Sequence, residues 1–194
     1  FLNNFDRIDS EFFRYVVEHR KQLAEKYTGE SVERKISMNY ARNIYNASLV
    51  RDEALVAKIK KEYLEVCGDV AVVQLAQMDM YTAQKNKDFK TMTALATLVA
   101  EKYCWNDQVQ LSNIVYTYVT VIDRKKDLKK AEKWIKRSIE LEEVSYNLYN
   151  YGCLLAKLGK DKAAIPVLKK AVEAANQEGN SAENAQELLN KLTQ

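Results

Sequence analysis

Apolar residues recur at steps of three and four residues along almost the whole chain, as they do on the buried face of an α-helix. One such run comprises Phe13, Val16, Val17, Leu23 and Tyr27. The 194 residues include only five glycines and one proline, which leaves few positions for the tight turns that a β-sandwich or β-barrel requires. The pattern therefore predicts an all-α protein.

Capping residues mark the ends of the expected helices. Glycine, which closes helices in the left-handed conformation, lies at Gly29, Gly68, Gly159 and Gly179. Side chains that can accept an amide hydrogen at a helix start are Ser10, Ser31, Asp52, Asp69, Asp88, Asp107, Asp127 and Ser181. These signals predict about ten helices, at 10–27, 31–46, 51–66, 69–85, 88–103, 107–122, 127–142, 145–158, 161–177 and 181–193. Because the loops between them are short, we expect neighbouring helices to be antiparallel.

Small and apolar residues repeat with a period of about 33 residues in the carboxy-terminal half. The clearest copy, at 145–175, has Leu148, Tyr151, Gly152, Leu155, Gly159, Ala164, Leu168 and Ala171. A weaker copy precedes it, with Val115, Tyr118, Val119, Ile122, Leu128, Ala131, Ile135 and Ser138, and a degenerate one spans 69–102. Glycine within a helix costs about 1 kcal/mol relative to alanine, so Gly152 predicts a close approach by the following helix.

These spacings resemble the tetratricopeptide repeat (TPR) family, whose period is about 34 residues. The resemblance is specific over 145–175, weaker over 112–144 and poor before that. It implies a right-handed superhelical array of antiparallel helix pairs, a TPR-like α-solenoid. We accordingly expect amino-terminal hairpins without repeat consensus (1–68), TPR-like pairs (69–180) and a capping helix (181–194).

In this family the first helix of each pair lines a concave groove. The resemblance therefore implies a groove that binds a peptide or protein through Asn113, Tyr116, Thr120, Arg124, Tyr146, Tyr149, Asn150, Cys153 and Lys157. Tyrosine suits this role because it offers a large contact area and a hydrogen-bonding hydroxyl. The alternative is that these tyrosines are half-buried between helices and bind nothing. Asn150 and Lys157 also match residues with which some family members hold a terminal carboxylate, but Thr117 in the preceding repeat leaves that set incomplete.

The composition argues against several classes of active site. The chain has one histidine, His19, and three cysteines without CxxC spacing, Cys67, Cys104 and Cys153. A zinc site of four cysteines or a local redox motif cannot be built from these residues, and the glycines are too dispersed for a phosphate-binding loop. We therefore expect a non-enzymatic protein without a metal or cofactor.

Charge and hydropathy narrow the range of partners. The net charge of +3 is too small to indicate nucleic acid, and no apolar run approaches the roughly 18 residues of a membrane span. Eight basic residues nevertheless cluster between Arg124 and Arg137. That cluster is either a solvated outer face or a contact for an acidic partner.

A second resemblance concerns the opening segment. Its aromatic residues, among them Phe5, Phe12 and Tyr15, and the later stretch 154–160 resemble the helical region behind the thioredoxin-like domain of some bacterial envelope proteins. The chain begins at Phe1 rather than methionine, which we interpret as a mature form or a fragment. This resemblance implies an upstream thioredoxin fold that carries its own CxxC.

Two functional hypotheses follow from the sequence. The first is a TPR-like interaction module that binds a peptide, a protein or a neighbouring domain of its own chain. The second is the helical accessory domain of a thioredoxin-like thiol-disulfide oxidoreductase. If the thioredoxin-like resemblance holds, it implies a location in the bacterial periplasm or cell envelope. If it does not hold, we expect a cytoplasmic location.

Overall fold

The computed structural model describes residues 7–194, and these form helices without any strand. The all-α prediction is therefore confirmed for the described residues. The α-helices are α1 (Glu11–Glu18), α2 (Arg20–Lys26), α3 (Gly29–Leu49), α4 (Glu53–Cys67), α5 (Asp69–Lys85), α6 (Phe89–Leu98), α7 (Gln108–Val121), α8 (Lys125–Leu141), α9 (Ser145–Lys157), α10 (Asp161–Glu178) and α11 (Glu183–Thr193). Phe5, part of the aromatic pattern noted above, lies outside the described residues.

Two of the expected helices are interrupted. The helix expected at 10–27 divides into α1 and α2 at His19, whose ring stacks on Tyr15 at 4.0 Å. The His19 Nδ1 also donates to the Tyr15 carbonyl at 3.0 Å, so the side chain competes for a backbone acceptor. The helix expected at 88–103 begins as α6 and ends in a π-helical turn, η1 (Val99–Tyr103). There the Cys104 amide donates to the Val99 carbonyl at 2.8 Å, five residues back.

Four of the expected amino-terminal caps are present. Ser10, Asp52, Asp88 and Asp107 each accept an amide hydrogen from the third residue that follows. A fifth, Ser181, accepts from the Glu183 amide at 3.3 Å just before α11.

Gly68 and Gly179 end α4 and α10 as expected, and Gly159, just after α9, also has a positive φ. Four other expected end signals are wrong. Ser31, Asp69 and Asp127 lie inside helices, and Gly29 opens α3 instead of closing a helix. Asp127 is buried and pairs with Arg124, which precedes α8. An acidic residue in the first helical turn interacts favourably with the helix dipole even when it is not the cap. The sequence alone therefore does not distinguish an acidic N-cap from an acidic residue in the first turn.

The chain divides into two compact units, one ending at Met78 and the other starting at Asp79. The core of the first unit is aromatic. Tyr40 stacks on Tyr63 with ring centroids 4.9 Å apart, and Phe13 meets Tyr40 edge to face at 5.2 Å. The hydroxyls of the two tyrosines form hydrogen bonds within the fold. Tyr63 is hydrogen-bonded to Ser37, and Tyr40 donates to Glu62 at 2.9 Å.

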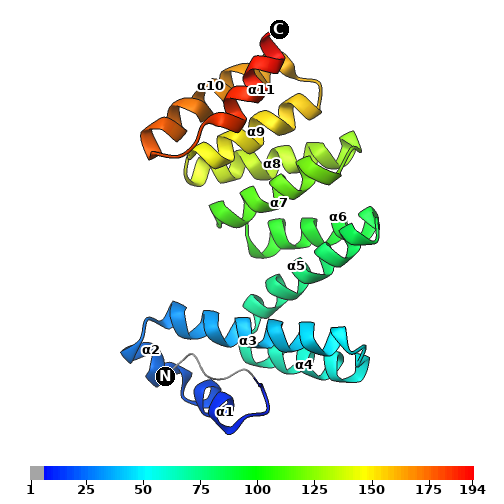
Figure 1. Ribbon diagram of the computed structural model, residues 1–194, viewed down its shortest axis with the longest axis vertical. Helices are drawn as coiled ribbons and strands as arrows, with labels where there is room; N and C mark the ends of the chain where they lie inside the picture. The colour runs from blue at the N-terminus through cyan, green and yellow to red at the C-terminus, as the bar shows by residue number, and fades with distance from the viewer. Residues whose placement is uncertain (1–6) are drawn as a thin grey trace. The chain divides into compact units, whose positions relative to one another are not determined.

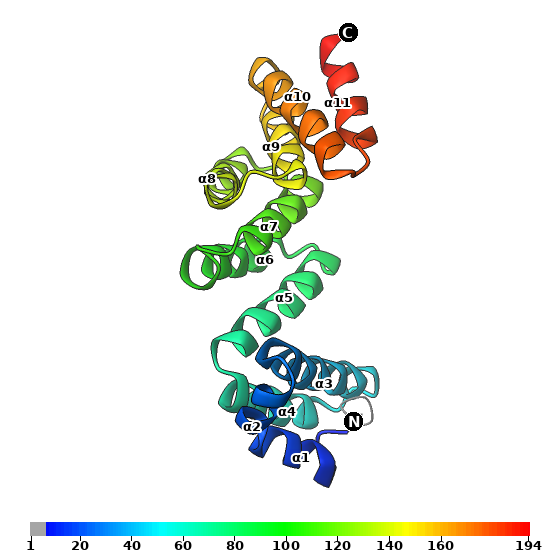
Figure 2. The ribbon, with the colours of Figure 1, turned by 90° about the vertical axis from the view of Figure 1, so that its left-hand side faces the viewer.

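The second unit contains two helical hairpins followed by a closing helix. The α7–α8 hairpin contacts the α9–α10 hairpin, mainly through α9, and α11 lies along α10 (Figures 1 and 2). Its largest buried side chain is Trp134, which packs edge to face on Tyr118 at 5.2 Å and donates to Glu101 at 3.3 Å.

Two helices of this unit, α9 and α10, approach closely at Gly152. A Cβ at this position would lie 2.4 Å from Cδ2 of Leu168 in α10. Leu168 is fully buried, so its side chain occupies the space that any larger residue would need. The expected close approach is confirmed.

We expect Gly152→Ala to lower the free energy of unfolding of the second unit by about 1–2 kcal/mol. Because Leu168 is fully buried, the cost of overpacking should lie in the upper part of its usual range of about 1–3 kcal/mol. That cost exceeds the gain of about 1 kcal/mol in helix propensity. Urea titration followed by tryptophan fluorescence measures this unit, because both tryptophans, Trp105 and Trp134, lie in it.

The matched control is Gly29→Ala, where the new Cβ would meet Ala24 at an ordinary 3.5 Å. Circular dichroism should show no loss of stability for this variant. A Gly152→Ala protein as stable as the unmodified chain would contradict the tight α9–α10 contact.

Candidate functional site

The second unit has a cavity of about 500 Å³ between α7, α9, the end of α10 and the start of α11. We call it the tyrosine cavity. Its lining is formed by Tyr116, Ser145, Tyr146, Tyr149, Ala171, Ala175, Asn180, Ser181, Ala182, Asn184 and Ala185. The fold thus brings together three of the residues expected to form a groove, one from α7 and two from α9. The volume is within the range of about 300–1,000 Å³ that is typical of ligand pockets.

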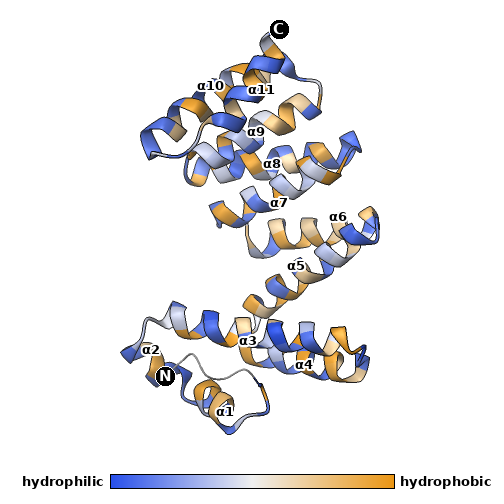
Figure 3. Cartoon of the chain, in the orientation of Figure 1, coloured by the Kyte–Doolittle hydropathy of each residue, from blue (hydrophilic) through white to orange (hydrophobic). Residues whose placement is uncertain are grey.

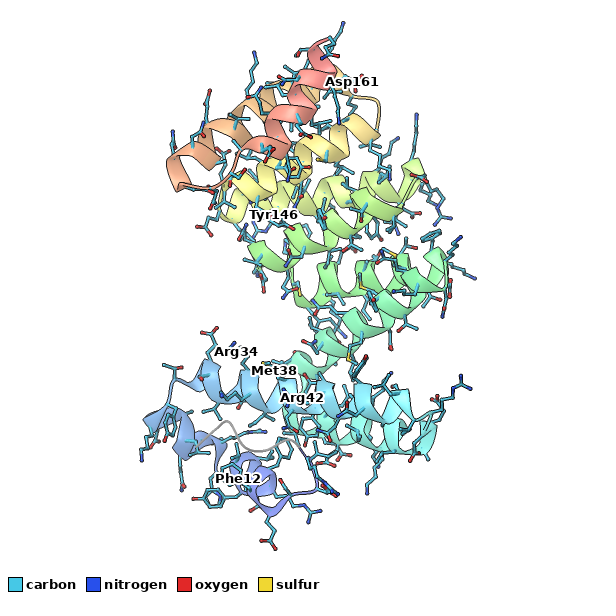
Figure 4. The ribbon with its side chains drawn as sticks, viewed as in Figure 1. Phe12, Arg34, Met38, Arg42, Tyr146 and Asp161 are labelled. Carbon is cyan, nitrogen blue, oxygen red and sulfur yellow. The ribbon has the colours of Figure 1, made fainter. Side chains whose placement is uncertain are left out.

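Two of the tyrosines are about half exposed, Tyr116 at 48% and Tyr146 at 42%. Their rings are tilted by 39°, with centroids 6.4 Å apart. Tyr146 is labelled in Figure 4. Its hydroxyl donates to Oδ1 of Asn113 on α7 at 3.3 Å. Residues 113 and 146, and likewise 116 and 149, are 33 positions apart, so the sequence repeat places equivalent side chains next to each other.

The third tyrosine, Tyr149, is more buried and is hydrogen-bonded to Cys153. Burial raises the pKa of the Tyr149 phenol above its ordinary value, and the bond to Cys153 adds to this effect. Burial also raises the pKa of the Cys153 thiol. Both groups are therefore protonated at neutral pH, so Cys153 lacks the thiolate character of a nucleophile.

A carboxylate holds two residues of the cavity lining, Ser145 and Asn180. Glu178, at the end of α10, accepts hydrogen bonds from the amide and the hydroxyl of Ser145, the former at 2.8 Å. It also accepts from the Asn180 amide at 2.9 Å. These bonds join the start of α9 to the end of α10, and they hold the pKa of Glu178 below its ordinary value.

Asn113 is exposed beside the cavity, whereas Asn150 lies elsewhere. Asn150 is only 1% exposed, and its amide donates to the Ser112 hydroxyl at 2.9 Å. It therefore connects α9 to α7 inside the unit. An internal position of this kind leaves the Asn150 side chain no capacity to contact a ligand.

The remaining predicted residues, other than Cys153, lie towards the far end of α7. Lys157 donates to the Val119 carbonyl at 2.8 Å and pairs with Asp123 at 2.9 Å. Arg124 pairs with Asp127, and the Thr120 hydroxyl donates to Thr117. Since neither Asn150 nor Lys157 lines the cavity, the pair suggested for holding a terminal carboxylate is not assembled there.

The contribution of α10 and α11 to the lining of the tyrosine cavity was not predicted from the sequence. The repeat pattern assigns a groove to the first helices of the pairs, but α11 folds back along α10 and brings Ala182, Asn184 and Ala185 to the cavity. The reversal occurs at Gly179, whose φ of 73° favours glycine. That glycine, followed by asparagine and serine, was the available signal for the turn.

The basic residues of α8 are mostly exposed, whereas Trp134 and other residues of this helix are buried. Figure 3 shows both hydrophilic and hydrophobic residues along α8. Two members of the basic cluster cover Trp105, with Lys133 Nζ 5.0 Å and the Arg137 guanidinium 5.8 Å from the ring centroid. Arg137 also donates to Asn106 at 2.8 Å. Part of the cluster thus holds the loop before α7 in place.

The first unit has a cavity of about 720 Å³, lined by both charged and apolar side chains, among them Arg14, Asn46, Leu55, Lys58 and Glu62. Across residues 7–194, no group of three or more His, Cys, Asp or Glu side chains is arranged to hold a metal ion. None of the described helices has the length and apolar character needed to cross a bilayer.

Comparison with known proteins gave no match, either to a protein-family model or to a curated protein. The function of this chain is therefore inferred from its own structure.

We expect Asn150→Ala to destabilise the second unit by about 1–3 kcal/mol, because it leaves the buried Ser112 hydroxyl without its partner. Asn113→Ala, an exposed change in the same predicted set, should cost less than about 0.5 kcal/mol. Urea titration with tryptophan fluorescence compares the two. Equal losses would contradict the division into internal and cavity-facing residues.

The Ser145–Glu178 bonds predict a pH dependence. Because the pKa of Glu178 is lower in the folded than in the unfolded state, its contribution to stability is present at neutral pH. That contribution is lost as the pH falls through the folded-state value. Glu178→Gln should therefore reduce the fall in melting temperature between about pH 7 and pH 3.

The control for this experiment is Glu173→Gln, an exposed carboxylate on the same helix. We expect its melting temperature to depend on pH as in the unmodified chain. An identical pH dependence for the Glu178→Gln variant would show that the Ser145 bonds do not contribute to stability.

Proposed function

We propose that this chain is a non-enzymatic interaction module that binds a peptide segment of a partner protein in the tyrosine cavity. The observation that carries the proposal is the convergence of Tyr116, Tyr146 and Tyr149, from two helices, on one cavity of about 500 Å³. Partly exposed tyrosines are frequent at binding surfaces, because each combines a large apolar area with a hydroxyl and has few rotatable bonds.

Hydrogen bonds between the helices that line the cavity favour binding. Asn150 fastens α9 to α7 through Ser112, and Glu178 fastens α9 to α10 through Ser145. These internal bonds fix the helices that carry the tyrosines before any ligand arrives. A site that is rigid in advance loses less conformational entropy on binding.

The arrangement of α7 to α11 is compatible with a TPR-like array, which we propose as the architecture of this unit. The support consists of antiparallel hairpins, the contact of α7 with α9 and the small residue at Gly152. The link to a thioredoxin-like oxidoreductase stays a prediction, since none of the described residues bears on it.

Selection of peptides from a random display library tests the proposal. Peptides enriched on the full chain should bind the Tyr116→Ala/Tyr146→Ala variant at least about tenfold more weakly, since buried tyrosine contacts often contribute about 2 kcal/mol or more. The melting temperature should change little, because both side chains are half exposed.

The control variant is Tyr45→Ala/Tyr81→Ala. These tyrosines are each 60% exposed and lie outside the cavity. Their removal should leave peptide binding unchanged. Failure to enrich any peptide, or an equal loss in the control variant, would overturn the proposed function.

A further inference from the structure

The lining of the tyrosine cavity contains no charged side chain. It consists only of tyrosine, alanine, serine and asparagine. Two carboxylates lie close to lining residues, because Glu178 accepts from Ser145 and Asn180, and Glu187 helps to raise the pKa of Tyr149. A charged ligand would lose hydration against the uncharged lining, which is costly, and an anionic one would also be repelled by these carboxylates. The cavity therefore favours an uncharged segment.

The polar groups of the lining favour a ligand with hydrogen-bond acceptors. The Tyr116 side chain is about half exposed, and the Asn184 side chain is exposed in the same lining. Each can donate to a ligand carbonyl. A proline residue offers such a carbonyl and has no amide hydrogen that needs a partner.

The shape of the lining suits flat, rigid side chains. The Tyr116 and Tyr146 rings are tilted and separated rather than stacked on each other, so their exposed surfaces are available to a ligand. The lining also includes the small residues Ala171, Ala175, Ala182 and Ala185. Aromatic-lined grooves bind proline-rich segments in the polyproline II conformation, which is largely formed before binding and so costs little entropy.

We propose that the tyrosine cavity binds an uncharged, proline-rich segment of a partner protein in the polyproline II conformation. This inference rests on the proposed function, and it specifies the class of ligand. It sets the site apart from one that holds a terminal carboxylate, for which no cationic side chain lines the cavity.

Fluorescence polarisation with the full chain tests the inference. The probe is a labelled peptide of about ten residues, with both termini blocked, no charged residue and proline at about every second position. A second probe replaces each proline by alanine, and a third retains the prolines but includes aspartates. We expect the first probe to bind at least about fivefold more tightly than either of the others.

The Tyr116→Ala/Tyr146→Ala variant should bind the proline-rich probe at least about tenfold more weakly, and Tyr45→Ala/Tyr81→Ala should bind it normally. Raising the salt concentration about tenfold should change the affinity less than about twofold, because no ion pair is formed.

The outcomes separate this inference from the proposed function. If the alanine probe binds as tightly and its binding needs Tyr116 and Tyr146, the peptide site stands and the preference for proline is overturned. If peptides selected from the library bind but the proline-rich probe does not, the preference for proline is again overturned. Tighter binding of the aspartate probe with a steep salt dependence would also overturn it. Proline-rich binding that survives loss of both tyrosines would overturn both proposals for this cavity.

Discussion

The close approach of α9 and α10 at Gly152 is the contact on which the second unit depends. The Leu168 side chain occupies the position where any other residue would place its Cβ, so a larger residue at position 152 would force this buried side chain to move. Both helices contribute to the lining of the tyrosine cavity, with Tyr146 and Tyr149 from α9 and Ala171 and Ala175 from α10. The packing of α9 on α10 therefore bears on the shape of the cavity.

Polar bonds between helices then fix the orientation of the tyrosines. Asn147 donates to the Glu142 carbonyl at 2.7 Å and accepts from the Val144 amide at 3.1 Å, which fixes the loop that leads into α9. Asn150 and Ser145 extend this attachment to α7 and α10. Such side chains cost free energy when buried without a partner, and each has one here. The helices that carry the half-exposed tyrosine rings are thus joined by polar side chains that already have hydrogen-bond partners within the unit.

The second unit presents two chemically distinct surfaces. The tyrosine cavity is neutral and concave, whereas the outer side of α8 is basic and exposed, with Lys133 and Arg137 resting on Trp105. Uncharged contacts give affinity that resists salt, and exposed charges act mainly on the rate of encounter. The proposed peptide site uses the first of these surfaces and does not need the second.

The sequence by itself determined the helical class and most helix positions, because apolar periodicity and caps such as Asp52 and Asp88 act through neighbouring residues. It also predicted the role of Gly152. Tertiary structure alone decided that Asn150 is internal while Tyr146 is exposed, although both lie on α9. It likewise decided that α11 adds a wall to the cavity. Local pattern does not encode which face of a helix meets which neighbour, because that depends on contacts such as Asn150 with Ser112, 38 positions apart.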